Sequence, residues 1–207
     1  LRYTGGLAAM SIDIKFYGGE RIPRVDDGIE YNIEGWGTFQ QLMWRWPESD
    51  LWLGAQLIYL DADIAFSSEN LPPLLQGLNS QVKNTGAGIA VSYDARDNIL
   101  TPTRGYQLDW YAREHWGEFI EDFDYVEVDG RNRWYFNPNP KWVLGLRADV
   151  SFTSGDVPFY ALPSIKQRGI ARGRYQGELV VATEIEARYQ LDGRWSGMGF
   201  ADDDARR

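Results

Sequence analysis

The chain has 207 residues, no cysteine and a formal net charge of -9, so disulfide scaffolds and thiolate metal sites are excluded. Its acidic balance argues against a nucleic-acid partner, because no basic stripe is present to neutralise phosphates. No apolar run approaches the roughly 20 residues that a membrane helix needs. A membrane-spanning barrel stays possible, since each of its strands carries only a weak signal.

Nine extended segments are predicted along the chain, with no helix between them. Each shows the alternation of apolar and polar residues that places successive side chains on opposite faces of a strand. Most of them exceed the five or six residues usual for strands of soluble proteins. They cover residues 2–17, 28–46, 50–66, 82–95, 104–118, 121–136, 140–153, 178–190 and 194–204.

The two faces of these segments are sorted by charge. In residues 140–153 Leu144, Leu146 and Val150 share one face, and Arg147 and Asp149 lie on the other. In a soluble sandwich the charged face would be the exterior, whereas in a membrane barrel the apolar face meets lipid and the charged face lines the interior. A soluble up-and-down barrel would be lined with apolar residues.

The connections favour the membrane barrel. Short turns are predicted at residues 47–49, 137–139 and 191–193, and longer loops at 18–27, 67–81 and 154–177. Short turns at one end and long loops at the other are typical of outer-membrane barrels.

Aromatic residues make up 14% of the chain, and many of them stand near predicted strand ends. Such residues favour membrane interfaces, where an apolar ring can lie beside a wet polar tip. In residues 50–66 the apolar face ends at Tyr59 and gives way to Asp61 and Asp63. We therefore predict aromatic girdles that include Trp44, Trp46, Trp52, Trp116, Trp134, Tyr135, Phe136, Trp142 and Trp195.

Residues 93–106 form a polar turn between two strands, fixed by Pro102 and ending at Gly105. In length and order they resemble the periplasmic turn of the BamA/TamA-type assembly barrels, the bacterial surface antigen family. The resemblance assigns the turn motif to Arg96, Asp97, Asn98, Pro102, Arg104 and Gly105.

Two further motifs carry the same resemblance. Arg168, Gly169 and Ile170 resemble the tip of the family's loop that folds back into the barrel, although Gln167 and Ile170 depart from the usual Val and aromatic residue. Phe200 and Asp202 resemble its F-x-D-x-G strand motif, with Asp204 in place of the glycine. The resemblance implies that Asp202 accepts an ion pair from Arg168. A planar carboxylate suits an arginine inside a lumen, and the neighbouring Glu184 and Glu186 are further candidate partners.

Catalytic interpretations are weak by comparison. His115 shares a strand face with Asp109 and Arg113, but the chain has no second histidine and no cysteine to complete a nucleophilic site. The paired acids Asp61 and Asp63 are not specific for a glycosidase, and residues 202–204 lack the spacing of a calcium loop. We expect no enzyme, no metal and no cofactor.

The resemblance implies an all-β fold, an antiparallel transmembrane β-barrel in the outer membrane of a Gram-negative bacterium. Residues 1–207 would supply nine of about sixteen strands of one barrel domain, without a POTRA module. About four strands would precede them and three would follow, so the chain is expected to be a fragment. The implied function is to assist insertion of outer-membrane proteins or polypeptide translocation. Outer-membrane lipid, unfolded clients and POTRA-associated partners are the implied contacts.

Three alternatives stay open at this point. The barrel could be a passive pore or surface antigen without assembly activity, or the carrier of an exported hydrolase domain located upstream. A soluble carbohydrate-active β-protein would need sugar-stacking aromatics beside paired acids in one cleft.

Overall fold

A computed structural model describes residues 1–17, 28–66, 80–118, 122–165, 175–193 and 195–206. Within these residues no helix has the length and apolar character needed to span a membrane. One short 3-10 helix, η1 (Phe159–Ala161), lies between the seventh and eighth strands of the chain. The strands are β1 (Arg2–Phe16), β2 (Ile29–Arg45), β3 (Leu51–Phe66), β4 (Ser80–Asp94), β5 (Gly105–Glu118), β6 (Asp122–Asn139), β7 (Trp142–Gly155), β8 (Leu179–Asp192) and β9 (Trp195–Arg206).

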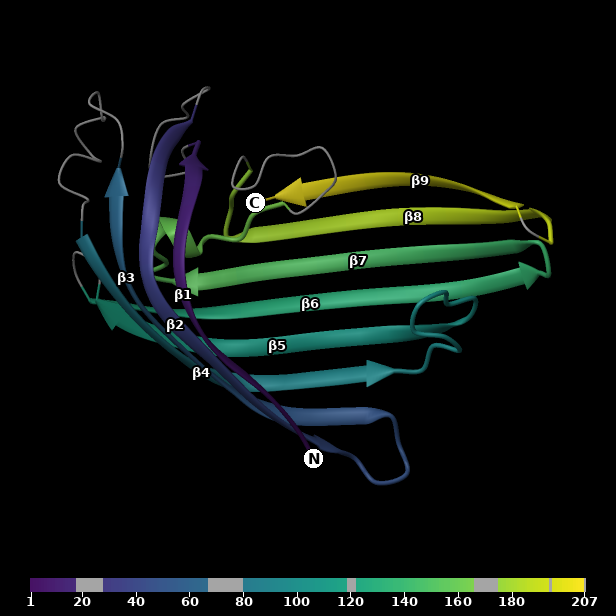
Figure 1. Cartoon of the computed structure of the whole chain (residues 1–207), viewed down its shortest axis with the longest axis horizontal. Coiled ribbons are helices and arrows are strands. Elements are labelled where there is room, and N and C mark those ends of the chain that lie inside the picture. The colour runs from purple at the N-terminus through teal and green to yellow at the C-terminus, as the bar shows by residue number, and fades with distance from the viewer. Residues whose placement is uncertain (18–27, 67–79, 119–121, 166–174, 194, 207) are drawn as a thin grey trace.

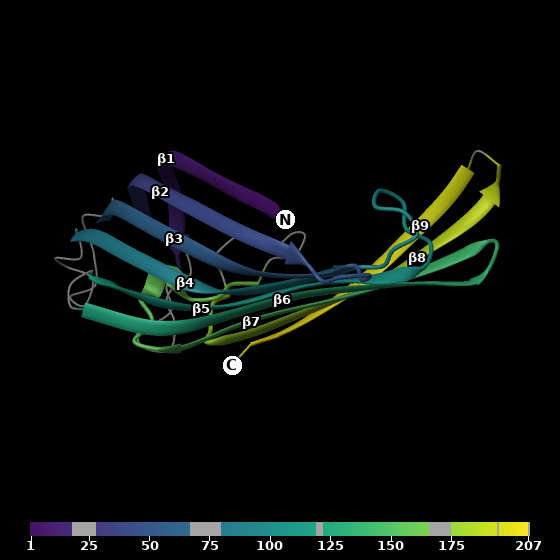
Figure 2. The ribbon, with the colours of Figure 1, turned by 90° about the horizontal axis from the view of Figure 1, so that it is seen from below.

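The strands form one antiparallel sheet in the order in which they occur along the chain, β1 to β9. The strand direction turns steadily from β1–β3 to β7–β9 (Figure 1), as the right-handed twist of strands requires. Figure 2 shows the sheet edge-on as a single curved layer. The predicted all-β, antiparallel architecture is confirmed, and no second sheet of a sandwich is present in the described residues.

The predicted segments agree with the observed strands to within a few residues, with two corrections at turns. β6 continues through Asn139 after an irregularity in its pairing with β7, so the reversal falls on residues 140–141 and not on 137–139. β8 similarly runs to Asp192, beyond the predicted start of its turn. The predicted loop at 18–27 and residues 67–79 of the loop predicted at 67–81 lie outside the described residues, and residues 80–81 already belong to β4.

The two faces of the sheet differ as predicted. We call the face that carries η1 the inner face and the opposite one the outer face. Large apolar side chains on the outer face are strongly exposed, and monomeric soluble proteins rarely show an apolar surface of this extent. Examples are Leu7, Leu57, Ile89 and Ile185, which are 73%, 57%, 66% and 56% exposed.

Aromatic side chains border the apolar outer surface on both sides. Trp36 packs on Tyr59 with ring centroids 5.0 Å apart toward the loop end, and Tyr93 stacks on Tyr106, also at 5.0 Å, toward the turn end. From Tyr59 to Leu51 there are eight residue steps of about 3.4 Å, or roughly 20 Å across a membrane for a strand tilted by about 40°. This width agrees with the apolar band of an outer-membrane barrel, about 25 Å.

Two residues assigned to the girdles from the sequence lie on the other face. Trp52 belongs to the inner face of β3, where the Arg2 guanidinium lies 4.7 Å from its ring centroid. Tyr135 is likewise an inner-face residue of β6. It stands an even number of residues from Glu127 and Asp129, and alternate residues of a strand share a face. The prediction was wrong for both because clustering near a strand end does not say to which face a ring belongs.

Toward the loop end the polarity of the two faces is reversed. The outer face there carries charged residues, among them Asp61, Asp63 and the ion pair of Lys15 with Glu30 at 3.2 Å. The inner face is apolar instead, which corrects the expectation of a polar interior over the full strand length. This part of the sheet behaves like a soluble β-protein, with water outside and a packed core inside. The core consists of Ile29, Tyr31, Ile64, Phe66 and Val82, covered by Ile14, Ile33, Leu60, Phe159 and Tyr160.

Candidate functional site

The connection between β7 and β8 returns over the inner face as two paired arms, which we call the loop ladder. Residues 163–165 pair with 175–177 through a bridge of Ser164 with Gln176, and the Ile165 amide donates to the Tyr175 carbonyl at 3.1 Å. A small cavity of about 30 Å³ lies between Ser164 and inner-face residues of β6, β7 and β8. The ladder therefore lies against this part of the sheet. Arg168, Gly169 and Ile170, between its arms, lie outside the described residues.

A second part of the same loop stays on the inner face and contacts strands near the opposite edge of the sheet. Phe159 of η1 packs against Tyr31 of β2 and Phe66 of β3, with ring centroids 5.5 and 5.8 Å apart. Tyr31 and Phe66 also contact each other at 5.5 Å. These three rings, the aromatic clasp, fasten the β7–β8 loop across the inner face near β1–β3, where Figure 1 shows η1 in green. The sequence motifs did not identify this contact.

The three predicted carboxylate partners of the loop arginine come together on neighbouring strands. Asp202 of β9 stands directly opposite Glu184 of β8, and Phe200 opposite Glu186. Like charges at directly opposed positions are destabilising unless a cation lies near them.

Two of the three carboxylates have arginine partners within the sheet. Arg147 lies 3.7 Å from Glu184 and 2.5 Å from Asp149, and Arg188 lies 3.1 Å from Glu186. Asp202 has no ion pair with any residue that the structure describes. A further cation at this position would relieve the repulsion between Asp202 and Glu184.

The turn motif between β4 and β5 is held by its own polar side chains. Arg96, whose side chain is 10% exposed, bonds Asp94 at 2.7 Å. Asp97 accepts from the Thr103 hydroxyl at 2.5 Å and from the amides of Thr103 and Arg104 at 2.9 and 3.2 Å. These hydrogen bonds stabilise the ionised carboxylate and lower the pKa of Asp97 to about 2, and the bond from the Thr103 hydroxyl has the largest effect.

The remaining motif residues also serve the shape of this turn. The Asn98 side chain accepts hydrogen bonds from the amides of Leu100 and Thr101 at 2.8 and 3.1 Å. Gly105 restarts the strand with φ of 101°, where a side chain would be strained and a Cβ would collide with the Ala95 carbonyl. The turn is thus a preformed structure, as its sequence indicates.

One contact ties this turn to a distant strand. The Arg188 guanidinium of β8 donates to the carbonyl oxygen of Pro102. The turn therefore bends over the inner face, from β4–β5 toward β8, at the end of the sheet opposite to the aromatic clasp (Figure 1). No local sequence pattern indicates a contact between residues so far apart in the chain.

The single histidine lies in a buried hydrogen-bond network on the inner face. His115 is 4% exposed, stacks on Tyr125 at 4.6 Å, and has its two ring nitrogens 3.0 Å from Asn84 and from Glu127. Glu127 also accepts from Arg113 at 3.0 Å. Both ring nitrogens are therefore engaged with neighbouring side chains, as in a structural histidine.

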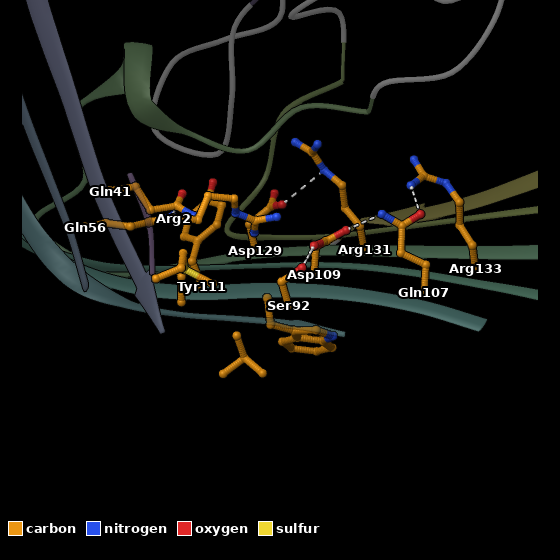
Figure 3. A pocket seen from close by; sticks show the side chains of 14 residues that line it. Arg2, Gln41, Gln56, Ser92, Gln107, Asp109, Tyr111, Asp129, Arg131 and Arg133 are labelled. Atoms are coloured by element: carbon orange, nitrogen blue, oxygen red, sulfur yellow. Dashed lines mark hydrogen bonds and ion pairs between the residues drawn. The ribbon is translucent and has the colours of Figure 1, made fainter. Parts of the chain in front are cut away.

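A polar cavity of about 360 Å³ opens on the inner face over β1–β6 (Figure 3). Its floor contains a chain of hydrogen bonds: Ser92 donates to Asp109 at 2.6 Å, Gln107 to Asp109 at 2.7 Å, and Arg133 to Gln107 at 3.2 Å. In Figure 3 the guanidinium groups of Arg131 and Arg133 point away from the sheet toward the side of the β7–β8 loop. The cavity adds a cationic region to an otherwise acidic protein.

The family model described as the Omp85 superfamily domain matches residues 59–202. The matched region begins within β3 and includes the turn motif, the β7–β8 loop and Asp202. No curated protein sequence matches the chain.

Proposed function

Because the chain belongs to the Omp85 superfamily, we propose that it forms part of a barrel that assists insertion of outer-membrane proteins or translocation of polypeptides, in the manner of the BamA/TamA-type factors. The superfamily is a family of outer-membrane β-barrels concerned with insertion and translocation. The antiparallel sheet with an apolar outer face and a largely polar inner face has the architecture of such a barrel wall. The outer membrane of a Gram-negative bacterium is the proposed location.

Two observations carry the proposal: the loop ladder lies on the inner face against β6, β7 and β8, and Asp202 stands opposite Glu184 on the same face. A loop held inside the barrel can brace the wall only if its tip finds a fixed partner there. Asp202 and Glu184 face each other with one arginine, Arg147, near Glu184 and none near Asp202 in the described residues. The proposed partner is Arg168, whose guanidinium could bond a carboxylate in two places and fix the orientation of the loop.

On this proposal the chain acts by binding and positioning and not as an enzyme. The barrel holds a client near its wall while the client's strands pair, and strand addition at a sheet edge supplies main-chain hydrogen bonds. Unfolded outer-membrane proteins are the proposed clients, and POTRA-associated proteins the proposed periplasmic partners.

The test is folding of an outer-membrane protein into proteoliposomes that contain the full-length protein. We expect faster folding than in empty liposomes, and slower folding with Arg168→Ala or Asp202→Ala. The double variant should be no worse than either single one, because the two residues act as a pair. Asp203→Ala, on the outer face of the same strand, is the matched control. Proteoliposomes that conduct ions without speeding folding would identify a passive pore.

A further inference from the structure

The polar cavity over β1–β6 has no part in the loop mechanism above. Its volume of about 360 Å³ lies within the range of ligand-binding pockets, roughly 300–1,000 Å³. We propose that it binds an acidic, extended segment of a client polypeptide, an inference that rests on the proposed function and names the chemistry of its substrate. The residues that carry it are Arg2, Arg131, Arg133, Gln41, Gln56 and Gln107.

Two arginines of β6 have guanidinium groups with spare donors. Arg133 donates to a neutral acceptor, the Gln107 amide oxygen, at 3.2 Å. The Arg131 guanidinium is 3.6 Å from Asp129, too long for a hydrogen bond, and its side chain is 52% exposed. A guanidinium is a fork of several donors suited to carboxylates. Within the described residues, most donors of these two side chains are available to a ligand.

The other charged side chains of the cavity do not neutralise the available guanidinium donors of Arg131 and Arg133. The Arg2 guanidinium is held over the Trp52 ring and pairs with no carboxylate of the described chain. Asp109 is already bonded by Ser92 at 2.6 Å, and Asp129 accepts from a serine hydroxyl at 2.7 Å. Three arginines thus face two aspartates whose oxygens are partly occupied. The cavity attracts anions despite the net charge of the chain.

The arrangement fits a peptide better than an isolated anion. Arg131 and Arg133 are two residues apart on one strand, which spaces them by about 7 Å, the same distance as alternate side chains of an extended peptide. Glutamine amides both donate and accept, as peptide groups do. Gln56 donates to Gln41 at 3.0 Å, but its own buried oxygen lacks a donor in the described residues. Such a group usually has a partner, which a peptide N–H would supply.

The experiment measures binding of short labelled peptides to the full-length protein in neutral nanodiscs, by fluorescence anisotropy at low and physiological salt. One peptide carries Asp at alternate positions and its control carries Asn there. We expect the Asp peptide to bind at least about tenfold more tightly, and salt to weaken it. The double variant Arg131→Gln with Arg133→Gln should lose about tenfold or more. Lys15→Gln with Lys83→Gln removes equal charge from the outer face and should bind as wild type.

Three results would overturn the inference. These are equal binding of the Asp and Asn peptides to the wild type, unchanged binding by the arginine variant, and displacement of the peptide by equimolar pyrophosphate or anionic lipid. The first needs no variant and therefore does not depend on folding. Client folding in proteoliposomes separates this inference from the proposed function. If the protein speeds client folding but binds the Asp and Asn peptides equally, the peptide site alone is refuted. If it prefers the Asp peptide but does not speed client folding, the proposed function alone is refuted.

Discussion

Replacing Ile89 by arginine tests which medium meets the outer face. Ile89 is 66% exposed and lies between Ala55 of β3 and Ala112 of β5, in the middle of the apolar band. Little packing is lost when it is changed. In water such a substitution alters stability by about 0.5 kcal/mol at most. In lipid an arginine near the midplane costs about 2–4 kcal/mol.

Thr85→Arg is the matched control on the same strand and face. Thr85 pairs with Tyr59 at the edge of the band, four residues from Ile89. Four steps of about 3.4 Å at a tilt of about 40° correspond to roughly 10 Å of depth, enough to reach the interface. There the cost falls to about 0–1 kcal/mol. Denaturant titration of the full-length protein in phospholipid vesicles measures both. An Ile89→Arg cost below about 1 kcal/mol, or equal to that of the control, would refute a lipid-facing outer surface.

Three further predictions concern the turn and the loop. The pKa of Asp97 is lowered to about 2 in the folded protein, so its stabilising effect is present above pH of about 4 and is lost as pH falls toward 2. Thermal unfolding should therefore find Asp97→Asn less stable than wild type at pH 7, with the difference shrinking as pH falls from about 4 and vanishing below about 2. Gly105→Ala should destabilise the protein by about 1–3 kcal/mol because φ is 101°, whereas Gly199→Ala, whose Cβ meets open space, should change the midpoint of unfolding little. Phe159→Ala removes the ring contacts with Tyr31 and Phe66, worth about 0.5–1.5 kcal/mol each, so hydrogen exchange of residues 160–165 should rise by about tenfold, and an unchanged rate would exclude the clasp as the anchor.

The sequence predicted the strands and the assignment of most side chains to faces because both depend on local alternation. Leu146 and Arg147 must point in opposite directions in any extended strand, so their environments differ wherever the strand lies. Alternation also predicted that Asp202 shares a face with Glu184 and Glu186 of the neighbouring strand, although the exact register that places Asp202 opposite Glu184 comes from the structure. The turn motif was predictable because its hydrogen bonds join residues close in sequence.

Contacts between distant strands could not be predicted in this way. The packing of Phe159 on Tyr31 and the bond from Arg188 to Pro102 depend on how the whole sheet curves. The apolar inner face at the loop end was missed for a related reason. Alternation assigns residues to faces, but it does not say where along a strand the membrane ends and a packed core begins. Asp61 and Asp63 gave that signal on the outer face only.

The most direct test of a polypeptide-handling barrel compares neighbouring residues of β5 that point in opposite directions. Gln107 lines the cavity, and Leu108 lies on the outer face. A photo-crosslinking amino acid is placed at each position of the full-length protein in native outer membranes during client synthesis, and the adducts are identified by mass spectrometry. The proposed function predicts client polypeptide at position 107 and lipid at position 108. Lipid at both positions, or no polypeptide at position 107 in the folded protein, would contradict it.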